Sequence, residues 1–195
     1  MAYNVENYTT SGYGRGFTLI ELVVTLAIGA VLLTMAVPNF TLTIKNNRVT
    51  AQTNDFVTSL NLARSEAIKR GARVTVCKSA DGSTCDTSTT GWEQGWIVFV
   101  DSNADQVHDG GETLLLTAGA LNTGTTLTGD SASNVKNYIS YRSSGKTTFP
   151  VNGGEAELIL CDDRNDKSVA KGITVSPTGR VSTILGSNSS LSCGS

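Results

Sequence analysis

Histidine is almost absent from this sequence, whose 195 residues include only His108. A multi-histidine metal centre is therefore excluded, and a Ser-His-Asp enzyme has little to draw on. Charged residues are also scarce, at 16% of the chain, against about a quarter in an average soluble domain. The formal net charge of −2 lacks the positive excess typical of nucleic-acid-binding proteins. The length suits one globular domain with an appendage.

One long apolar run lies near the N-terminus. Residues 17–37 read FTLIELVVTLAIGAVLLTMAV and hold a single charged side chain, Glu21. At about 1.5 Å per residue, a helix of this length spans roughly 31 Å, close to the thickness of a bilayer core. A plain single-pass anchor and a cleaved secretory signal peptide are two interpretations of such a run.

Glu21 argues against both interpretations. A carboxylate inside an apolar helix costs about 3 kcal/mol in lipid, and neither an anchor nor a signal peptide has a use for it. The residues before the run carry one arginine and one glutamate rather than a cationic block. Small residues near the end of the run, such as Gly29 and Ala36, leave cleavage by signal peptidase open.

The residues at the start of the run offer a third interpretation. The segment Gly16-Phe17-Thr18-Leu19-Ile20-Glu21 resembles the cleavage motif of type IV prepilins. The resemblance implies that prepilin peptidase cuts between Gly16 and Phe17 and methylates the new amino terminus. In an assembled filament, Glu21 would neutralise that amine on a neighbouring subunit, because a buried charge is tolerated when it is paired. Pro38 matches the family's helix-kinking proline.

The helical pattern continues beyond Pro38 and predicts one helix from Phe17 to about Arg70. Lys69 and Arg70 precede Gly71, as is typical of a helix C-terminus. We expect the second half of the helix to be amphipathic and to pack on a globular head. Its apolar face is formed by Leu42, Val49, Phe56, Leu60, Ala63 and Ala67.

The remainder of the chain reads as short strands. Runs rich in β-branched and aromatic residues alternate with turn residues, and no βαβ alternation occurs. We therefore expect an α+β protein of the type IV pilin-like fold, with the long N-terminal helix packed on an antiparallel β-sheet or sandwich head. The expected strands are 73–78, 95–101, 113–118, 125–128, 137–142, 157–161, 172–176 and 180–184. The expected parts are a leader (1–16), a transmembrane and assembly helix (17–37), its amphipathic continuation (38–71) and the head (72–195).

Four cysteines permit three pairings and suit two disulfides in an oxidising compartment. We favour Cys77–Cys85, across a short polar loop, and Cys161–Cys193, which would hold the C-terminal tail against a strand. A zinc site is the alternative, but the sequence has no Cys-x-x-Cys pair.

A second resemblance lies about eighty residues after the first. The segment 91–101, GWEQGWIVFVD, leads into an Asp-x-Asn-x-Asp loop and a glutamate. It resembles the GspH/FimT group of type IV minor pilins and minor pseudopilins, which includes FimU-like proteins.

The loop also has the spacing of a calcium site, with candidate ligands at positions 1, 3, 5, 7, 9 and 12. Gln106, however, stands where an EF-hand needs glycine, and the flanks look like strands. A polar hairpin without metal is the alternative, and no other cofactor is expected. The candidate ligands are Asp101, Asn103, Asp105, the Val107 carbonyl, Asp109 and Glu112.

The resemblances imply a structural protein rather than an enzyme. The implied function is a minor pilin of the inner membrane, single-pass with a periplasmic head, that meets prepilin peptidase and the inner-membrane assembly platform. It would join other minor pilins and the major pilin in a priming or tip complex. One alternative is a minor pseudopilin of a type II secretion system. The other is a DNA-binding minor pilin for natural transformation, since some relatives bind DNA through Gly-Arg-x-Arg. Here that segment reads Gly179-Arg180-Val181-Ser182, leaving Arg180 with Lys171 nearby.

Overall fold

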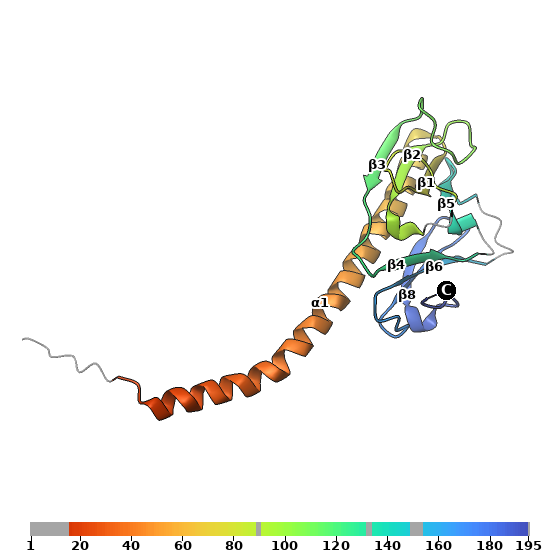
Figure 1. Cartoon of the computed structure of the whole chain (residues 1–195). Coiled ribbons are helices and arrows are strands. Elements are labelled where there is room, and N and C mark those ends of the chain that lie inside the picture. The colour runs from red at the N-terminus through yellow and green to blue at the C-terminus, as the bar shows by residue number, and fades with distance from the viewer. Residues whose placement is uncertain (1–15, 89–90, 132–133, 149–153, 195) are drawn as a thin grey trace, which may run out of the picture. The chain divides into compact units, whose positions relative to one another are not determined.

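A computed structural model describes residues 16–88, 91–131, 134–148 and 154–194. The expected leader, apart from Gly16, lies outside the described residues. The chain divides into two compact units, Met1–Thr43 and Ile44–Ser195. Helix α1 (Leu19–Arg70) begins in the first unit and ends in the second, which also holds all the described strands (Figure 1).

In the first unit, α1 starts with a local cap. The Thr18 hydroxyl accepts a hydrogen bond from the Glu21 N–H (3.2 Å), and the Thr18 carbonyl accepts one from the Leu22 N–H (3.1 Å). These bonds satisfy donors that every helix leaves free at its first turn. By length and composition, α1 is able to cross a membrane, and its most apolar stretch is not buried against any described residue. Pro38 lies inside the helix.

In the second unit, α1 is amphipathic. Val49, Phe56, Leu60 and Ala63 are buried at steps of three, four or seven, as the sequence predicted. Leu42, which we expected to begin this stripe, is 49% exposed and belongs to the first unit. The expected stripe is therefore wrong at this residue, because the contacts that bury the stripe all lie within the second unit.

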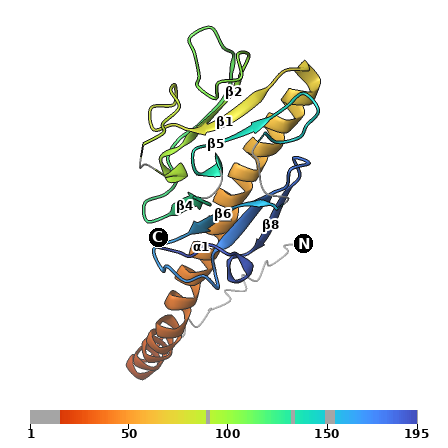
Figure 2. The same cartoon turned by 90° about the vertical axis from the view of Figure 1, so that its right-hand side faces the viewer.

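The strands form two antiparallel four-stranded sheets, which Figures 1 and 2 show one beyond the other along α1. All eight overlap the predicted strands, and the expected fold class is confirmed. The first sheet has the order β3-β2-β1-β5, with β1 (Val74–Lys78), β2 (Trp96–Val100), β3 (Leu114–Ala118) and β5 (Tyr138–Tyr141). The second has the order β4-β6-β7-β8, with β4 (Thr126–Gly129), β6 (Ala156–Cys161), β7 (Lys171–Val175) and β8 (Val181–Leu185).

One core joins α1 to both sheets, and Figure 2 shows the helix crossing behind them. Phe56 lies at its centre. The ring of Trp92, in the short helix η1 (Trp92–Gln94), and the ring of Trp96 pack edge-on against Phe56 at centroid distances of 5.1 and 5.0 Å. There are two further short described helices. Helix η2 (Asn134–Lys136) lies between β4 and β5, and helix η3 (Gly186–Asn188) follows β8.

The cysteines form the two disulfides that the sequence favoured, Cys77–Cys85 and Cys161–Cys193. The second joins the end of β6 to the tail. There it lies in a small cluster with Ile159, Ala170 and Leu191, which is separate from the main core. The tail is therefore packed on the sheet as well as covalently held.

Candidate assembly and binding sites

The first candidate site is the start of α1. Gly16 and Phe17 precede the helix, and Phe17 is 80% exposed. A Cβ added at Gly16 would meet no atom within 4 Å, so packing among the described residues does not require glycine there. The Glu21 carboxylate has no hydrogen bond or ion pair to another residue in the described part of the chain. The Glu21 N–H thus takes part in the cap of α1, whereas its carboxylate is paired with no described residue.

The second candidate site is the acidic loop between β2 and β3. Asp101 is 1% exposed and accepts a hydrogen bond from the Thr75 hydroxyl at 2.7 Å. Glu112 closes the other end, since its two carboxylate oxygens accept from the Ser102 N–H (2.6 Å) and the Asp109 N–H (3.3 Å). Both terminal carboxylates are thus engaged by the protein itself.

The polar side chains in the middle of the loop also form hydrogen bonds within the loop. The Asn103 side-chain NH₂ donates to Asp105 (2.8 Å) and Asp109 (3.0 Å), and Asp105 also accepts from the Val107 N–H (2.9 Å). Gln106 adopts a positive φ of 67°, the conformation that usually calls for glycine. No group of three or more acidic, histidine or cysteine side chains suited to a metal occurs among the described residues. The calcium interpretation therefore gains no support, because Asp105, Asp109 and Glu112 already accept hydrogen bonds from the loop itself, and only one Asp101 oxygen lacks a partner among the described residues.

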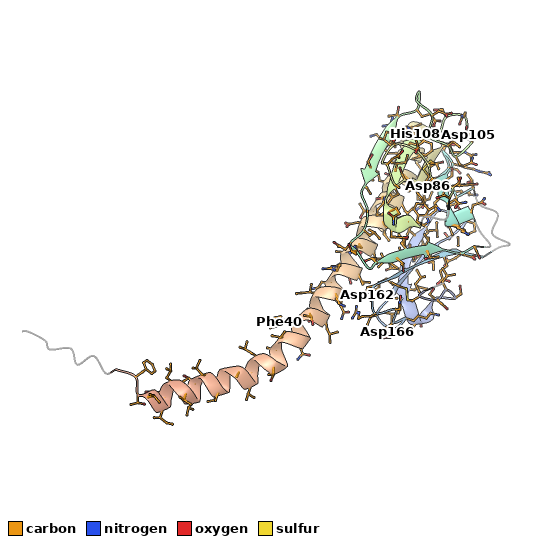
Figure 3. The ribbon with its side chains drawn as sticks, viewed as in Figure 1. Phe40, Asp86, Asp105, His108, Asp162 and Asp166 are labelled. Carbon is orange, nitrogen blue, oxygen red and sulfur yellow. A yellow bond between two sulfur atoms is a disulfide. The ribbon has the colours of Figure 1, made fainter. Side chains whose placement is uncertain are left out.

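His108 links this loop to the loop closed by Cys77–Cys85. Its Nδ1 lies 2.6 Å from the Ser83 carbonyl oxygen, and its ring packs edge-on against Phe99 at 5.2 Å. Figure 3 labels Asp105 and His108 at one end of the head, and Asp162 and Asp166 at the other. The sequence analysis missed this contact, because no residue pattern in either loop predicts which other loop it will touch.

The disulfide loop has two electrostatic features of its own. Hydrogen bonds from Thr84 hold the pKa of Asp81 well below its ordinary value. Lys78 is buried, and its ammonium donates to the Ser88 carbonyl at 3.1 Å. Burial lowers the pKa of Lys78, and the Asp86 carboxylate opposes that shift.

At the other end of the head, an ion pair joins α1 to the loop between β6 and β7. The Lys45 ammonium lies 2.9 and 2.7 Å from the two carboxylate oxygens of Asp163. This contact holds the pKa of Asp163 below its ordinary value. Both side chains stay partly exposed, so solvent weakens the attraction.

The two cations proposed for DNA binding lie apart. Lys171 opens β7 and faces Leu185, whereas Arg180 lies in the turn that follows β7. The five residues of β7 span roughly 17 Å at the usual strand rise. Two other cationic side chains, Arg142 and Lys146, are exposed on a different turn.

That turn and the turn of Arg180 are held together by α1. Arg64 donates from Nε to the Gly145 carbonyl and from Nη2 to the Thr178 carbonyl, both at 3.1 Å. The Thr147 N–H adds a bond to the Pro177 carbonyl at 3.2 Å. Gly179 has φ +81°, and a Cβ there would lie 1.9 Å from the Gly145 oxygen. This glycine is required by packing, whatever Arg180 does.

A family model described as Type II transport protein GspH matches residues 52–179, more than half of the chain. The chain belongs to the GspH family. A second model, the prokaryotic N-terminal methylation motif, matches residues 13–37 and so includes Gly16, Phe17 and Glu21. This GspH-family chain is accordingly of the type IV minor pilin or pseudopilin kind, a structural class with an apolar N-terminal helix that anchors it in a membrane.

Individual relatives agree with the family. Pilin-like protein PilA1 of Thermus thermophilus is 34% identical over 100 residues, which cover 50% of this chain and 55% of that protein. The chain therefore matches little more than half the length of this curated relative. Crystal structures of the type IV minor pilin FimU of Pseudomonas aeruginosa superpose with TM-scores of 0.58 and 0.52. They are 17% and 16% identical, and they cover 76% and 74% of this chain and 97% and 98% of theirs.

The GspH match contains some of the candidate sites and ends before others. The Trp92–Trp96 segment and the whole acidic loop lie inside residues 52–179. Arg180 and Cys193 lie beyond the matched range, and Pro38 lies between the two family matches.

Proposed function

We propose that this GspH-family protein is a minor pilin that is processed at Gly16–Phe17 and joins a tip complex. Prepilin peptidase cleaves the bond and methylates the amine of Phe17. The mature subunit waits in the inner membrane, with its head in the periplasm, where disulfides form. The inner-membrane assembly platform then brings it together with other minor pilins, and the major pilin polymerises from that complex.

The uncovered apolar half of α1 is the observation that carries this proposal. Its large side chains, such as Leu19, Leu26 and Leu33, are exposed, and Glu21 is the one charge among them. A membrane covers such a surface first, and a bundle of similarly apolar helices can replace the lipid. An unpaired carboxylate is costly in either place, and a neighbour's Phe17 ammonium removes that cost on assembly.

Two variants separate the charge of Glu21 from the local cap. Glu21→Gln keeps the backbone bond to the Thr18 hydroxyl but removes the charge, whereas Thr18→Ala removes the cap and keeps the charge. We expect both to enter the membrane, and only Glu21→Gln to be lost from filaments. Normal incorporation of Glu21→Gln would contradict the pairing role. Mass analysis of the wild-type protein should show methylated Phe17 as its first residue.

A minor pseudopilin of a type II secretion system is the alternative within the same family. The matched model takes its description from type II transport, whereas PilA1 is named a pilin-like protein and FimU a type IV minor pilin. We favour the pilus on those two relatives. Deletion of the gene followed by electron microscopy of surface filaments, with secretion measured in parallel, separates the two: loss of secretion with normal filaments would assign the pseudopilin.

DNA capture is a second candidate function, favoured by one observation. Arg142, Lys146 and Arg180 are exposed on the two turns that Arg64 holds together. Several cations acting together are what phosphate backbones bind. A salt-dependent gel shift of the detergent-solubilised protein tests this. The triple alanine variant should lose the shift, and Lys171→Ala, at the far end of β7, should keep it.

A further inference from the structure

A groove of about 400 Å³ lies between α1 and one edge of the first sheet. Its helix side includes Gln52, Asp55 and Thr58, and its other side is the end of β3 with the segment that follows it. β3 is the outermost strand of its sheet (Figure 1), so one side of its backbone has no strand partner in the described part of the chain. The groove therefore borders a free sheet edge.

Two side chains that line the same groove carry buried donors without a partner among the described residues. Trp96 and Gln52 are 2% and 5% exposed, and both line it. The Trp96 indole N–H and the Gln52 Nε2 amide reach no acceptor among the described residues. The other end of the Gln52 side chain is already used, because its oxygen accepts from the Thr125 hydroxyl at 3.1 Å. Buried polar groups are nearly always satisfied, so two orphan donors at one groove indicate an occupant that supplies acceptors.

Charge narrows the kind of acceptor. Asp55 is exposed at the groove and has no ion pair within the residues that the structure describes. The negative charge of Asp55 would repel a carboxylate or phosphate in the groove, whereas a peptide carbonyl is neutral and would not be repelled. An extended peptide presents carbonyl groups at every second residue on each side and can pair with a free strand edge by its remaining backbone groups.

We propose that an extended segment of a neighbouring pilin subunit lies in this groove, beside β3. Its peptide carbonyls accept from the Trp96 indole and the Gln52 amide after a small shift of the groove wall, because both nitrogens are buried in the free subunit. A basic side chain on the segment lies near Asp55. This inference rests on the proposed function, because it names the surface by which the subunit meets its partner in the complex.

Photocrosslinking in the producing cells tests the groove with the full-length protein. The probe is p-benzoylphenylalanine at Thr58, an exposed groove residue of α1. Its control position is Thr50, also exposed on α1 but lining the separate cavity beside β8. We expect the probe at Thr58 to join one short segment of another chain that carries its own prepilin motif. The same segment should be missing from the adducts at Thr50.

The two tryptophans supply matched variants. Trp92→Phe and Trp96→Phe each shorten a ring that packs on Phe56, but the Trp92 N–H already donates to the Val135 carbonyl at 2.9 Å. Per folded molecule, Trp96→Phe should lower the adduct yield at Thr58 about fivefold, the worth of one ordinary hydrogen bond. Trp92→Phe should leave that yield unchanged and cost more stability.

Each outcome decides the matter. Adducts to a pilin segment that fall with Trp96→Phe alone support the proposal. Equal yields in the two variants, adducts only to chains that are not pilins, or no adduct at Thr58 in cells whose filaments contain the protein would overturn the groove and leave the proposed function intact. Absence of the wild-type protein from every filament would overturn the proposed function, and the groove with it.

Discussion

Replacing Gly179 by alanine should lower the free energy of unfolding more than the same replacement at any other described glycine with a positive φ. The residue has φ +81°, which costs an alanine about 1 kcal/mol. The new Cβ would also lie 1.9 Å from the Gly145 oxygen, a backbone atom, so the two turns must move apart. That movement breaks the bond from Arg64 Nε to the same oxygen, and a hydrogen bond to a charged group contributes about 1.5–3 kcal/mol. The two contributions together predict a loss of about 2.5–4 kcal/mol.

Urea unfolding of the full-length protein in detergent measures this loss, and Gly71→Ala is the matched control. Gly71 has a similar φ of +64°, but a Cβ there meets nothing within 4 Å. It should therefore show the backbone cost alone, about 1 kcal/mol. Equal losses for Gly179→Ala and Gly71→Ala would refute the reasoning, because they would mean that the turns separate without cost and that Arg64 does not hold them.

Three further predictions concern the disulfides, the ion pair and the acidic loop. Replacing both cysteines by alanine should cost about 3.7 kcal/mol at Cys161–Cys193 and about 2.6 kcal/mol at Cys77–Cys85 by chain entropy, because the pairs lie 32 and 8 residues apart; equal losses in urea unfolding would contradict this. The pKa of Asp163 is lowered by Lys45, so its contribution is present at neutral pH and is lost as the pH falls below its unfolded value of about 4. Asp163→Asn should accordingly lower the melting temperature more at pH 7 than at pH 3. Millimolar calcium should leave the melting temperature unchanged, since Asp105, Asp109 and Glu112 already accept hydrogen bonds within the loop, and a saturable heat of calcium binding would contradict that.

The fold was predictable because its signals are local. The apolar run at the start of α1, Lys69 and Arg70 before Gly71, and turn residues between β-branched runs each mark an element without reference to the rest of the chain. Even the fully buried strands β1 and β2, which lack alternation, were bounded by such turns. The prediction that Leu42 is buried was wrong because burial depends on the contacts that a residue makes in space. Periodicity along the sequence does not give those contacts.

The acidic loop shows why spacing of polar residues predicts chemistry poorly. Asp and Asn at alternate positions suit calcium, and they equally accept N–H groups two or three residues away. Asp105 accepts in this way from the Val107 N–H, and Glu112 from the Asp109 N–H. The sequence offers the oxygens in both cases. Only the backbone path, including the positive φ of Gln106, decides what they bind.

The tryptophan pair shows the same limit inside the core. Gly91-Trp92 and Gly95-Trp96 repeat the same dipeptide four residues apart, and both rings pack on Phe56 as apolar periodicity would suggest. Yet Trp92 lies in the helical turn η1, where its N–H reaches the Val135 carbonyl. Trp96 opens β2, and its N–H reaches no acceptor among the residues that the structure describes. Packing requires only that a ring be near, whereas a hydrogen bond requires an acceptor within about 3 Å and in line. Residue type therefore determines where these side chains are buried, and local backbone direction determines which of them is left to bind something else.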